Sequence, residues 1–129
     1  MMERIIKPLT PTELEIMEIL WRENRPLSAL EILELSENRS WKQNSLYPTL
    51  QHLQEKNAVV ITGYVPVKRK YARTYLPTYS KSKYQLSRLE KPGENLDIVS
   101  LLREQLEKGK ISDSDLSAIE NMIKDYRGN

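Results

Sequence analysis

Two repeats of one pattern, a polar cap followed by apolar positions at helical spacing, predict the first two helices. Thr10-Pro11-Thr12-Glu13 joins a capping threonine to a proline at the first helical position and a glutamate three residues after the cap. Apolar residues then recur every three or four positions, which predicts an amphipathic helix to about Glu23 with Trp21 in the core. Ser28-Ala29-Leu30-Glu31 repeats the capping pattern and predicts a short second helix that ends between residues 36 and 40.

A third helix is predicted from three leucines between residues 46 and 53, at spacings of four and three. Pro48 restricts where this helix can begin, because proline lacks an N–H group and is tolerated only in the first turn. Ser45 is therefore the predicted cap. Asn57 tolerates the left-handed conformation and is the predicted end.

A β-hairpin is predicted to follow the third helix. Ala58–Thr62 is rich in β-branched residues and Arg73–Leu76 alternates polar and apolar positions, so both are predicted strands. Gly63 marks a turn or a bulge, and Val67–Tyr71 is a basic loop between the strands. Three helices followed by such a hairpin predict a mainly α, winged helix-turn-helix fold with a two-stranded wing.

A fourth helix is predicted over Ser80–Glu90. It would turn Tyr84 and either Leu86 or Leu89 inward. Lys91-Pro92-Gly93 interrupts it, because proline and glycine together break a helix, and this interruption marks the predicted domain boundary.

Residues 1–90 are accordingly predicted to form a winged-helix domain, and residues 91–129 a short helical dimerisation region. Two amphipathic segments in the second region, the later one capped by Ser112-x-x-Asp115, are too short to bury their apolar stripes alone. We expect a second copy of the chain to cover them; the alternative is that they fold back onto the amino-terminal domain. The predicted interface residues are Ile98, Leu101, Leu102, Leu106, Leu116, Ile119, Ile123 and Tyr126.

Composition argues against most catalytic and metal chemistry. The chain has no cysteine, which leaves no disulfide, no thiolate nucleophile and no cysteine metal site, and its single histidine, His52, argues against a histidine-based metal or acid/base site. No stretch approaches the roughly 18–20 apolar residues of a membrane span, and the first ten residues lack the apolar segment of a secretory signal. We expect a cytoplasmic protein that is not an enzyme and holds no metal or cofactor.

The net charge of +2 is the sum of two acidic blocks and one strongly basic block between them. Residues 1–37 carry four Lys and Arg against eight Glu, and residues 90–129 carry six against nine acidic residues. Residues 38–89 carry ten Lys and Arg against Glu55 alone, a net charge of +9 that suits a phosphate-binding surface. A solvated basic surface is the alternative on charge alone, so the order of the elements must decide.

That order favours DNA. In a winged helix-turn-helix the third helix enters the major groove amino end first, and the hairpin loop touches the backbone or the minor groove. Gln and Asn can pair with adenine, and Lys with guanine or phosphate. The predicted DNA-binding residues are Lys42, Gln43, Asn44, Ser45, Tyr47 and Gln51 around the third helix, and Lys68, Arg69, Lys70 and Arg73 on the hairpin. The alternative is a winged-helix module that binds protein within a larger assembly.

The chain also resembles a known family. The residues that carry the resemblance are Leu9–Trp21, Pro26-Leu27-Ser28, Glu31-Ile32, Trp41, and Ser45-Leu46 with Leu50 and Leu53. Over roughly residues 9–126 the chain is similar to the penicillinase-repressor family, which contains the beta-lactamase, methicillin-resistance and copper-responsive repressors. The resemblance implies a homodimeric transcriptional repressor that binds a dyad operator in double-stranded DNA, with intertwined carboxy-terminal helices.

Three features bear on the signal that would release the DNA. The cysteine-rich tail of the copper-responsive branch is absent. The antibiotic-resistance branch implies a membrane-bound sensor protease that cuts an Asn-Phe bond, but this chain has no phenylalanine and has Glu104 and Gln105 near that position, so the inducer is open. Tyr47-Pro48 in the third helix resembles the recognition helix of the phenolic-acid-repressor family, which shares the fold and the DNA binding.

Overall fold

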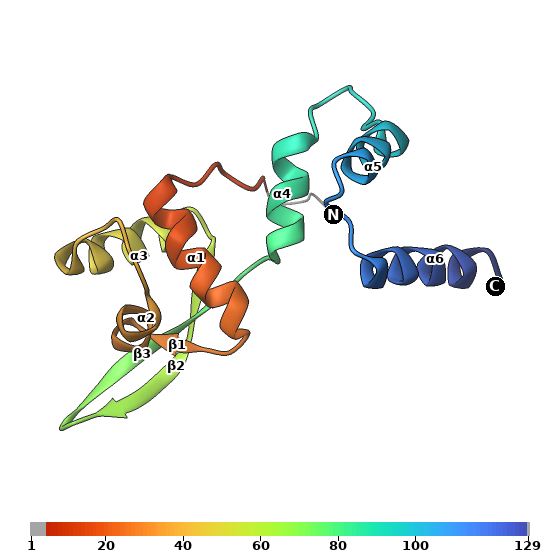
Figure 1. The fold of residues 1–129 in the computed structure, drawn as a ribbon. Helices are drawn as coiled ribbons and strands as arrows, with labels where there is room; N and C mark the ends of the chain where they lie inside the picture. Colours follow the sequence, from red (N-terminus) through yellow and green to blue (C-terminus); the bar gives the residue numbers. More distant parts are fainter. Residues whose placement is uncertain (1–4, 129) are drawn as a thin grey trace. The chain divides into compact units, whose positions relative to one another are not determined.

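The computed structural model describes residues 5–128, with the elements labelled in Figure 1. These elements are α1 (Pro11–Glu23), β1 (Leu27–Ser28), α2 (Ala29–Leu35), the 3-10 turn η1 (Gln43–Ser45), α3 (Leu46–Glu55), β2 (Val59–Val67), β3 (Lys70–Pro77), α4 (Lys81–Leu89), α5 (Ile98–Glu107) and α6 (Asp113–Gly128). Two compact units divide the chain between Lys91 and Pro92. The first contains α1 to α4 and the sheet, and has the winged helix-turn-helix fold; the second contains α5 and α6.

Both predicted capping boxes are confirmed. Thr10 Oγ1 accepts a hydrogen bond from the Glu13 amide at 3.2 Å, while Glu13 Oε1 accepts one from the Thr10 amide at 2.8 Å. Ser28 and Glu31 make the same reciprocal pair at the start of α2, at 3.2 and 3.1 Å. Each box satisfies two backbone donors at a helix start, which is why both helices begin where the sequence predicts.

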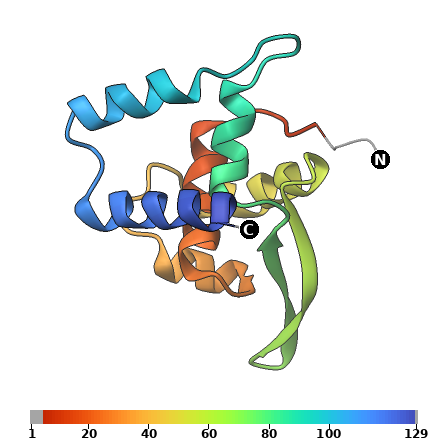
Figure 2. The same ribbon diagram turned by 90° about the vertical axis from the view of Figure 1, so that its right-hand side faces the viewer.

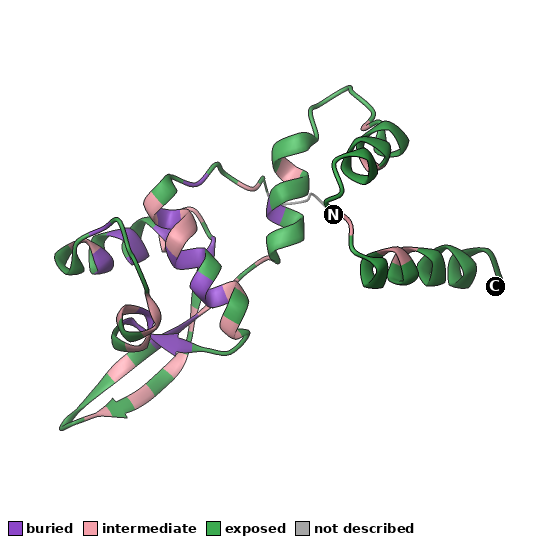
Figure 3. Ribbon diagram, viewed as in Figure 1, coloured by how far each residue is buried: buried purple, intermediate pink, exposed green. Residues whose placement is uncertain are grey.

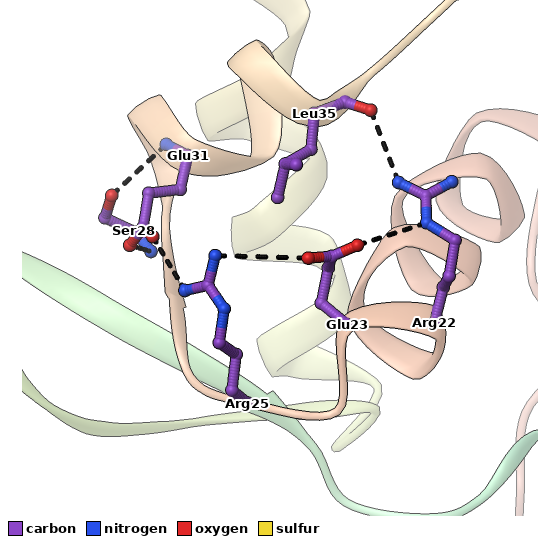
Figure 4. Close-up of polar contacts among 6 residues, drawn as sticks. All are labelled: Arg22, Glu23, Arg25, Ser28, Glu31 and Leu35. Carbon is purple, nitrogen blue, oxygen red and sulfur yellow. Dashed lines mark hydrogen bonds and ion pairs between the residues drawn. The ribbon is translucent and has the colours of Figure 1, made fainter.

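Charged side chains brace the turn between α1 and α2 (Figure 4). Arg22 donates from Nη2 to the Leu35 carbonyl at 3.3 Å. Arg25 lies between two carboxylates, with Nη1 2.8 Å from Glu31 Oε2 and Nη2 4.0 Å from Glu23 Oε1. Both arginines are exposed, so solvent screens these contacts and each contributes little to the stability of the fold.

The end of α3 leads directly into the hairpin. Asn57 adopts the predicted left-handed conformation, with φ 59°. Its amide donates to the Gln54 carbonyl at 2.9 Å, and the Ala58 amide donates to the Leu53 carbonyl at 2.8 Å, which is the paired pattern of a Schellman ending. The chain thus reverses within two residues, so that β2 begins beside the helix it follows.

The sheet has three antiparallel strands in the spatial order β1-β3-β2. β1, which the sequence did not reveal, adds an edge by pairing Leu27 with Tyr75. The hairpin itself is confirmed, and the register shift between Ile61 and Gly63 confirms the predicted irregularity at Gly63 as a bulge.

The loop of the hairpin is shorter than predicted. Val67 pairs with Lys70, so the basic loop expected over Val67–Tyr71 is a two-residue turn, Lys68-Arg69. The predicted loop was too long because Gly63 and Pro66 interrupt the strand pattern without ending the strand. Their effect is local, since the ladder continues on both sides. The wing is consequently a long ribbon that extends past the helices (Figures 1 and 2).

The core of the first unit lies between α1, α2, α3 and the sheet, where the buried positions of Figure 3 gather. Its largest fully buried apolar side chains are Ile16, Met17, Leu20, Leu27, Ile32, Leu50 and Leu53. Every residue of this set was assigned to a helix or an apolar position by periodicity except Leu27. The core therefore holds α3 and the hairpin in a fixed relation to α1.

An aromatic cluster joins α1 to α4. Trp21 is partly buried against the core, as predicted, and its Nε1 donates to the Tyr79 carbonyl at 2.9 Å. The rings of Tyr79 and Tyr84 stack with centroids 6.1 Å apart, and Tyr84 is buried. The Tyr84 hydroxyl accepts a hydrogen bond from the Leu9 amide at 3.0 Å. The cluster thereby anchors α4 to the helical core.

The prediction that Leu86 or Leu89 points inward is wrong. These side chains are 43% and 53% exposed. Successive residues of an α-helix are rotated by about 100°, so Leu86 and Leu89 stand about 200° and 140° from Tyr84 around the axis. Once the stacked ring of Tyr84 occupies the inner face, neither leucine can share it.

An ion pair between a buried carboxylate and a partly buried lysine links α1 to the end of α3. Lys56 Nζ lies 2.6 Å from Glu13 Oε1, and the side chains are 25% and 3% exposed. Lys56 Nζ also donates to the Pro8 carbonyl at 3.0 Å. Burial alone would raise the pKa of the Glu13 carboxyl, but the hydrogen bonds from Lys56 and Thr10 together hold that pKa below its ordinary value. The carboxylate is therefore charged in the folded protein at neutral pH.

The second unit consists of the two predicted amphipathic helices. α5 is capped by Asp97, whose side chain accepts from the Ser100 amide at 3.1 Å, and the predicted Ser112 cap accepts from the Asp115 amide at 3.1 Å. No residue of α5 or α6 is buried within the single chain, and Figure 3 shows both helices as mostly exposed. Nowhere in residues 5–128 is a helix both long and apolar enough to cross a membrane.

Candidate nucleic-acid interface

Helix α3 turns one face to the core and the other to solvent. The buried face is formed by Leu46, Thr49, Leu50 and Leu53. Tyr47 and Gln51 lie on the other face, where Tyr47 is 69% exposed. Lys42, Gln43 and Asn44 precede the helix and are exposed as well. Five of the six residues predicted around the third helix are therefore open to solvent.

Ser45 is the sixth residue, and its predicted role as a cap is wrong. α3 begins immediately after it, but the Ser45 side chain makes no capping hydrogen bond. The preceding 3-10 turn gives Ser45 helical dihedral angles, φ −85° and ψ −12°, whereas a capping serine has an extended backbone. Ser45 is half-buried, and its carbonyl accepts a hydrogen bond from Thr49 Oγ1 at 2.7 Å.

The loop before α3 is tied to α1. Glu15 accepts a hydrogen bond from the Ser40 amide at 3.2 Å and another from the Ser40 hydroxyl. The next residue, Trp41, is buried, and the guanidinium of Arg39 lies 5.3 Å from the centroid of its ring. These contacts fix the backbone that delivers Lys42 to the amino end of α3.

The wing carries the second set of predicted residues. Lys68, Arg69, Lys70 and Arg73 are all exposed. Lys68 has φ 56°, a left-handed conformation that places a lysine at the tip of a tight turn. Because no acidic residue occurs between Glu55 and Glu90, the charge of the wing is not neutralised along the ribbon.

A groove of about 760 Å³ separates α3 from the wing. It is lined by Ala29 and Leu30 of α2, Tyr47 of α3, the stretch from Val67 to Arg73, and Tyr75. Tyr75 is buried at 4% exposure, and this burial raises the pKa of its hydroxyl, which Arg73 opposes in part. Its phenol is therefore a neutral group beside a cationic one.

The groove brings together residues that the sequence had assigned to two separate elements. Tyr47 comes from the predicted recognition helix, and Lys68, Arg69, Lys70 and Arg73 come from the predicted wing. Sequence reasoning missed Leu30 and Tyr71, which also line it. The alternation Tyr71-x-Arg73-x-Tyr75 could have revealed that these three side chains share one face of a strand.

Comparison with protein families gives a match over residues 9–125, to the family described as penicillinase repressor. The chain belongs to the penicillinase repressor family. No curated protein sequence matches it significantly. Among solved structures, it is similar to Staphylococcus aureus MarR in complex with salicylate and kanamycin, at 19% identity and a TM-score of 0.41, over 92% of this chain and 70% of that one.

Membership of the penicillinase repressor family identifies the chain as a DNA-binding transcriptional regulator of the repressor class. This agrees with the winged helix-turn-helix fold of the first unit and confirms the family resemblance of the sequence. The further likeness of Tyr47-Pro48 to the phenolic-acid repressors stays a prediction. The structure places Pro48 in the first turn of α3, where its missing N–H costs no hydrogen bond within the helix.

Proposed function

We propose that this penicillinase repressor is a homodimer that binds a dyad operator, with α3 in the major groove and the wing on the DNA backbone. The observation that supports the proposal is the placement of exposed polar residues before and on α3, and of exposed cations on the wing, on either side of one groove. Polar side chains can read base edges, whereas cations neutralise phosphates. The first contribution gives specificity, and the second gives affinity that depends on salt.

The experiment that tests the proposal is DNA binding by the purified chain to the region upstream of its own gene, at several salt concentrations. A scrambled duplex of the same composition is the competitor. Binding that survives the competitor supports a sequence-specific repressor. Binding that is absent or indifferent to sequence would favour a winged-helix module that binds protein instead.

Changing Lys68, Arg69 and Lys70 together to alanine should weaken binding to the operator and to the scrambled duplex alike. Each phosphate contact contributes about 0.9 to the slope of log K against log salt, so three lost contacts should flatten that slope by about 2–3. The matched control changes three exposed lysines outside the proposed surface, Lys91, Lys108 and Lys110, and should leave the slope as it is. Equal slopes for both triple variants would remove the wing from the DNA contact.

Asn44→Ala should weaken binding to the operator alone, whereas the wing variant should weaken binding to both duplexes. If Asn44 contacts a base edge, its loss costs about 1–3 kcal/mol on the operator and leaves binding to the scrambled duplex unchanged. Fluorescence anisotropy with both duplexes measures the difference, and Gln85→Ala, which removes an exposed amide on α4, is the control. Equal losses on the two duplexes would make Asn44 a backbone contact.

A further inference from the structure

Two large aromatic side chains face the groove without being buried in it. Tyr47 of α3 is 69% exposed and Tyr71 of β3 is 75% exposed, although both line the groove. Folding alone does not account for them, because neither ring is removed from water. An exposed apolar surface beside polar groups is typical of an interaction site, and the lining of this groove also includes the exposed cations Lys68, Arg69 and Arg73.

We propose that this groove holds the sugar-phosphate backbone of one DNA strand, and that Tyr71 packs against a deoxyribose there. The inference rests on the proposed function. With α3 in the major groove and the wing on the adjoining backbone, the strand that borders the major groove passes between α3 and the wing. The groove lies at that place, between Tyr47 and the hairpin.

The lining of the groove matches the alternating chemistry of such a strand. A deoxyribose presents C–H groups, which pack on the face of a tyrosine ring or on Leu30. A phosphate presents anionic oxygens, which Lys70 and Arg73 can bind. A purely basic groove would fit only the phosphates, and a purely apolar one only the sugars.

This arrangement predicts a part of the affinity that does not depend on salt. Cations release condensed counterions from DNA and so set the slope of log K against log salt. A neutral tyrosine displaces no counterion, so its contact changes the affinity equally at every salt concentration. Loss of the wing cations therefore changes the slope, whereas loss of a groove tyrosine changes Kd by the same factor at every salt concentration.

The test is Tyr71→Ala, with Kd for the operator duplex measured by anisotropy from low to high salt. We expect Kd to rise about tenfold at every salt concentration with an unchanged slope, because a large aromatic contact is lost. Tyr71→Phe keeps the ring and should stay within about threefold of the wild type. Because Tyr71 is exposed, both variants should keep the thermal unfolding midpoint of the wild type, which circular dichroism checks.

Tyr64→Ala is the matched control. Tyr64 lies on the same hairpin, opposite Arg73, and is 64% exposed, but it is not among the residues that line the groove. Its loss should change Kd by less than about twofold. The inference would be overturned by an unchanged Kd for Tyr71→Ala, or by a loss of affinity in Tyr64→Ala or Tyr71→Phe as large as that in Tyr71→Ala. In each of these cases, DNA binding by the wild type would still support the proposed function. No DNA binding by the wild type would overturn both.

Discussion

Replacing Lys56 by alanine should lower the free energy of unfolding by about 3 kcal/mol at pH 7, measured by urea denaturation. The Glu13 side chain is only 3% exposed, and Lys56 is the cation that contacts it. Removing that cation leaves a buried carboxylate without its counter-charge, which costs more than the pair itself contributes. Adding Glu13→Gln to this variant should restore part of the loss, because the amide removes the buried charge.

The pH dependence that Glu13 contributes should differ between the two proteins. In the wild type the pKa of Glu13 is held below its ordinary value of 4.5, so its stabilising contribution is present above about pH 4.5 and is lost as the pH falls through the folded pKa. In Lys56→Ala the hydrogen bonds from Thr10 still lower the pKa of Glu13, but burial opposes them without the help of Lys56. That pKa should therefore be higher than in the wild type, and the carboxylate should contribute less stability at neutral pH. The difference between the two free energies of unfolding should therefore shrink on acidification.

A matched control is available on the same helix. Lys81 Nζ lies 3.0 Å from Glu18 Oε1, also a contact between α1 and another element, but its side chains are 48% and 47% exposed. Lys81→Ala should change the free energy of unfolding by less than about 0.5 kcal/mol. If Lys56→Ala and Lys81→Ala lowered the free energy of unfolding by similar amounts, burial of Glu13 would not explain how much its ion pair contributes to stability.

Much of the fold was predictable because its signals are local. The two capping boxes, the left-handed Asn57 and the proline in the first turn of α3 each depend on residues close in sequence, and each specifies one backbone conformation. The Ser45 cap failed for a local reason, the adjacent 3-10 turn, but the other features that the sequence did not reveal depend on distant partners. β1 has only two residues and exists because β3 is beside it. The inward face of α4 was decided by the ring of Tyr79 against Tyr84.

The candidate site also combines features that the sequence predicts with one that depends on tertiary packing. Charge counting located the cations of the wing, and helical periodicity separated the outward residues of α3 from the buried ones. The groove between them is a product of tertiary packing, because it needs the register of β2 and β3 and the angle that the core sets for α3. Tyr71 was accordingly predicted only as the last residue of the basic loop, because its place in the groove depends on the register of the hairpin and on the facing helix.

The double variant Leu116→Asp with Ile119→Asp should convert the protein from dimer to monomer. Both residues are half-buried on one side of α6, in line with Ile123, which is 50% exposed in the single chain. Carboxylates on that stripe would have to be buried in the proposed interface without partners, which strongly disfavours association. Sedimentation equilibrium measures the mass, and we expect about one chain per particle.

Loss of the dimer should weaken binding to a dyad operator by at least about a hundredfold, because a dimer binds its second half-site at a high effective concentration and a monomer does not. Ser117→Asp with Asn121→Asp is the control: it adds the same charge to the same helix, at positions about 130° and 170° around the axis from the mean direction of Leu116 and Ile119. That variant should remain dimeric and bind the operator as the wild type does. If the stripe variant also remained dimeric, the tail would not form the interface, and the exposed leucines of α4, Leu86 and Leu89, would be the next surface to test.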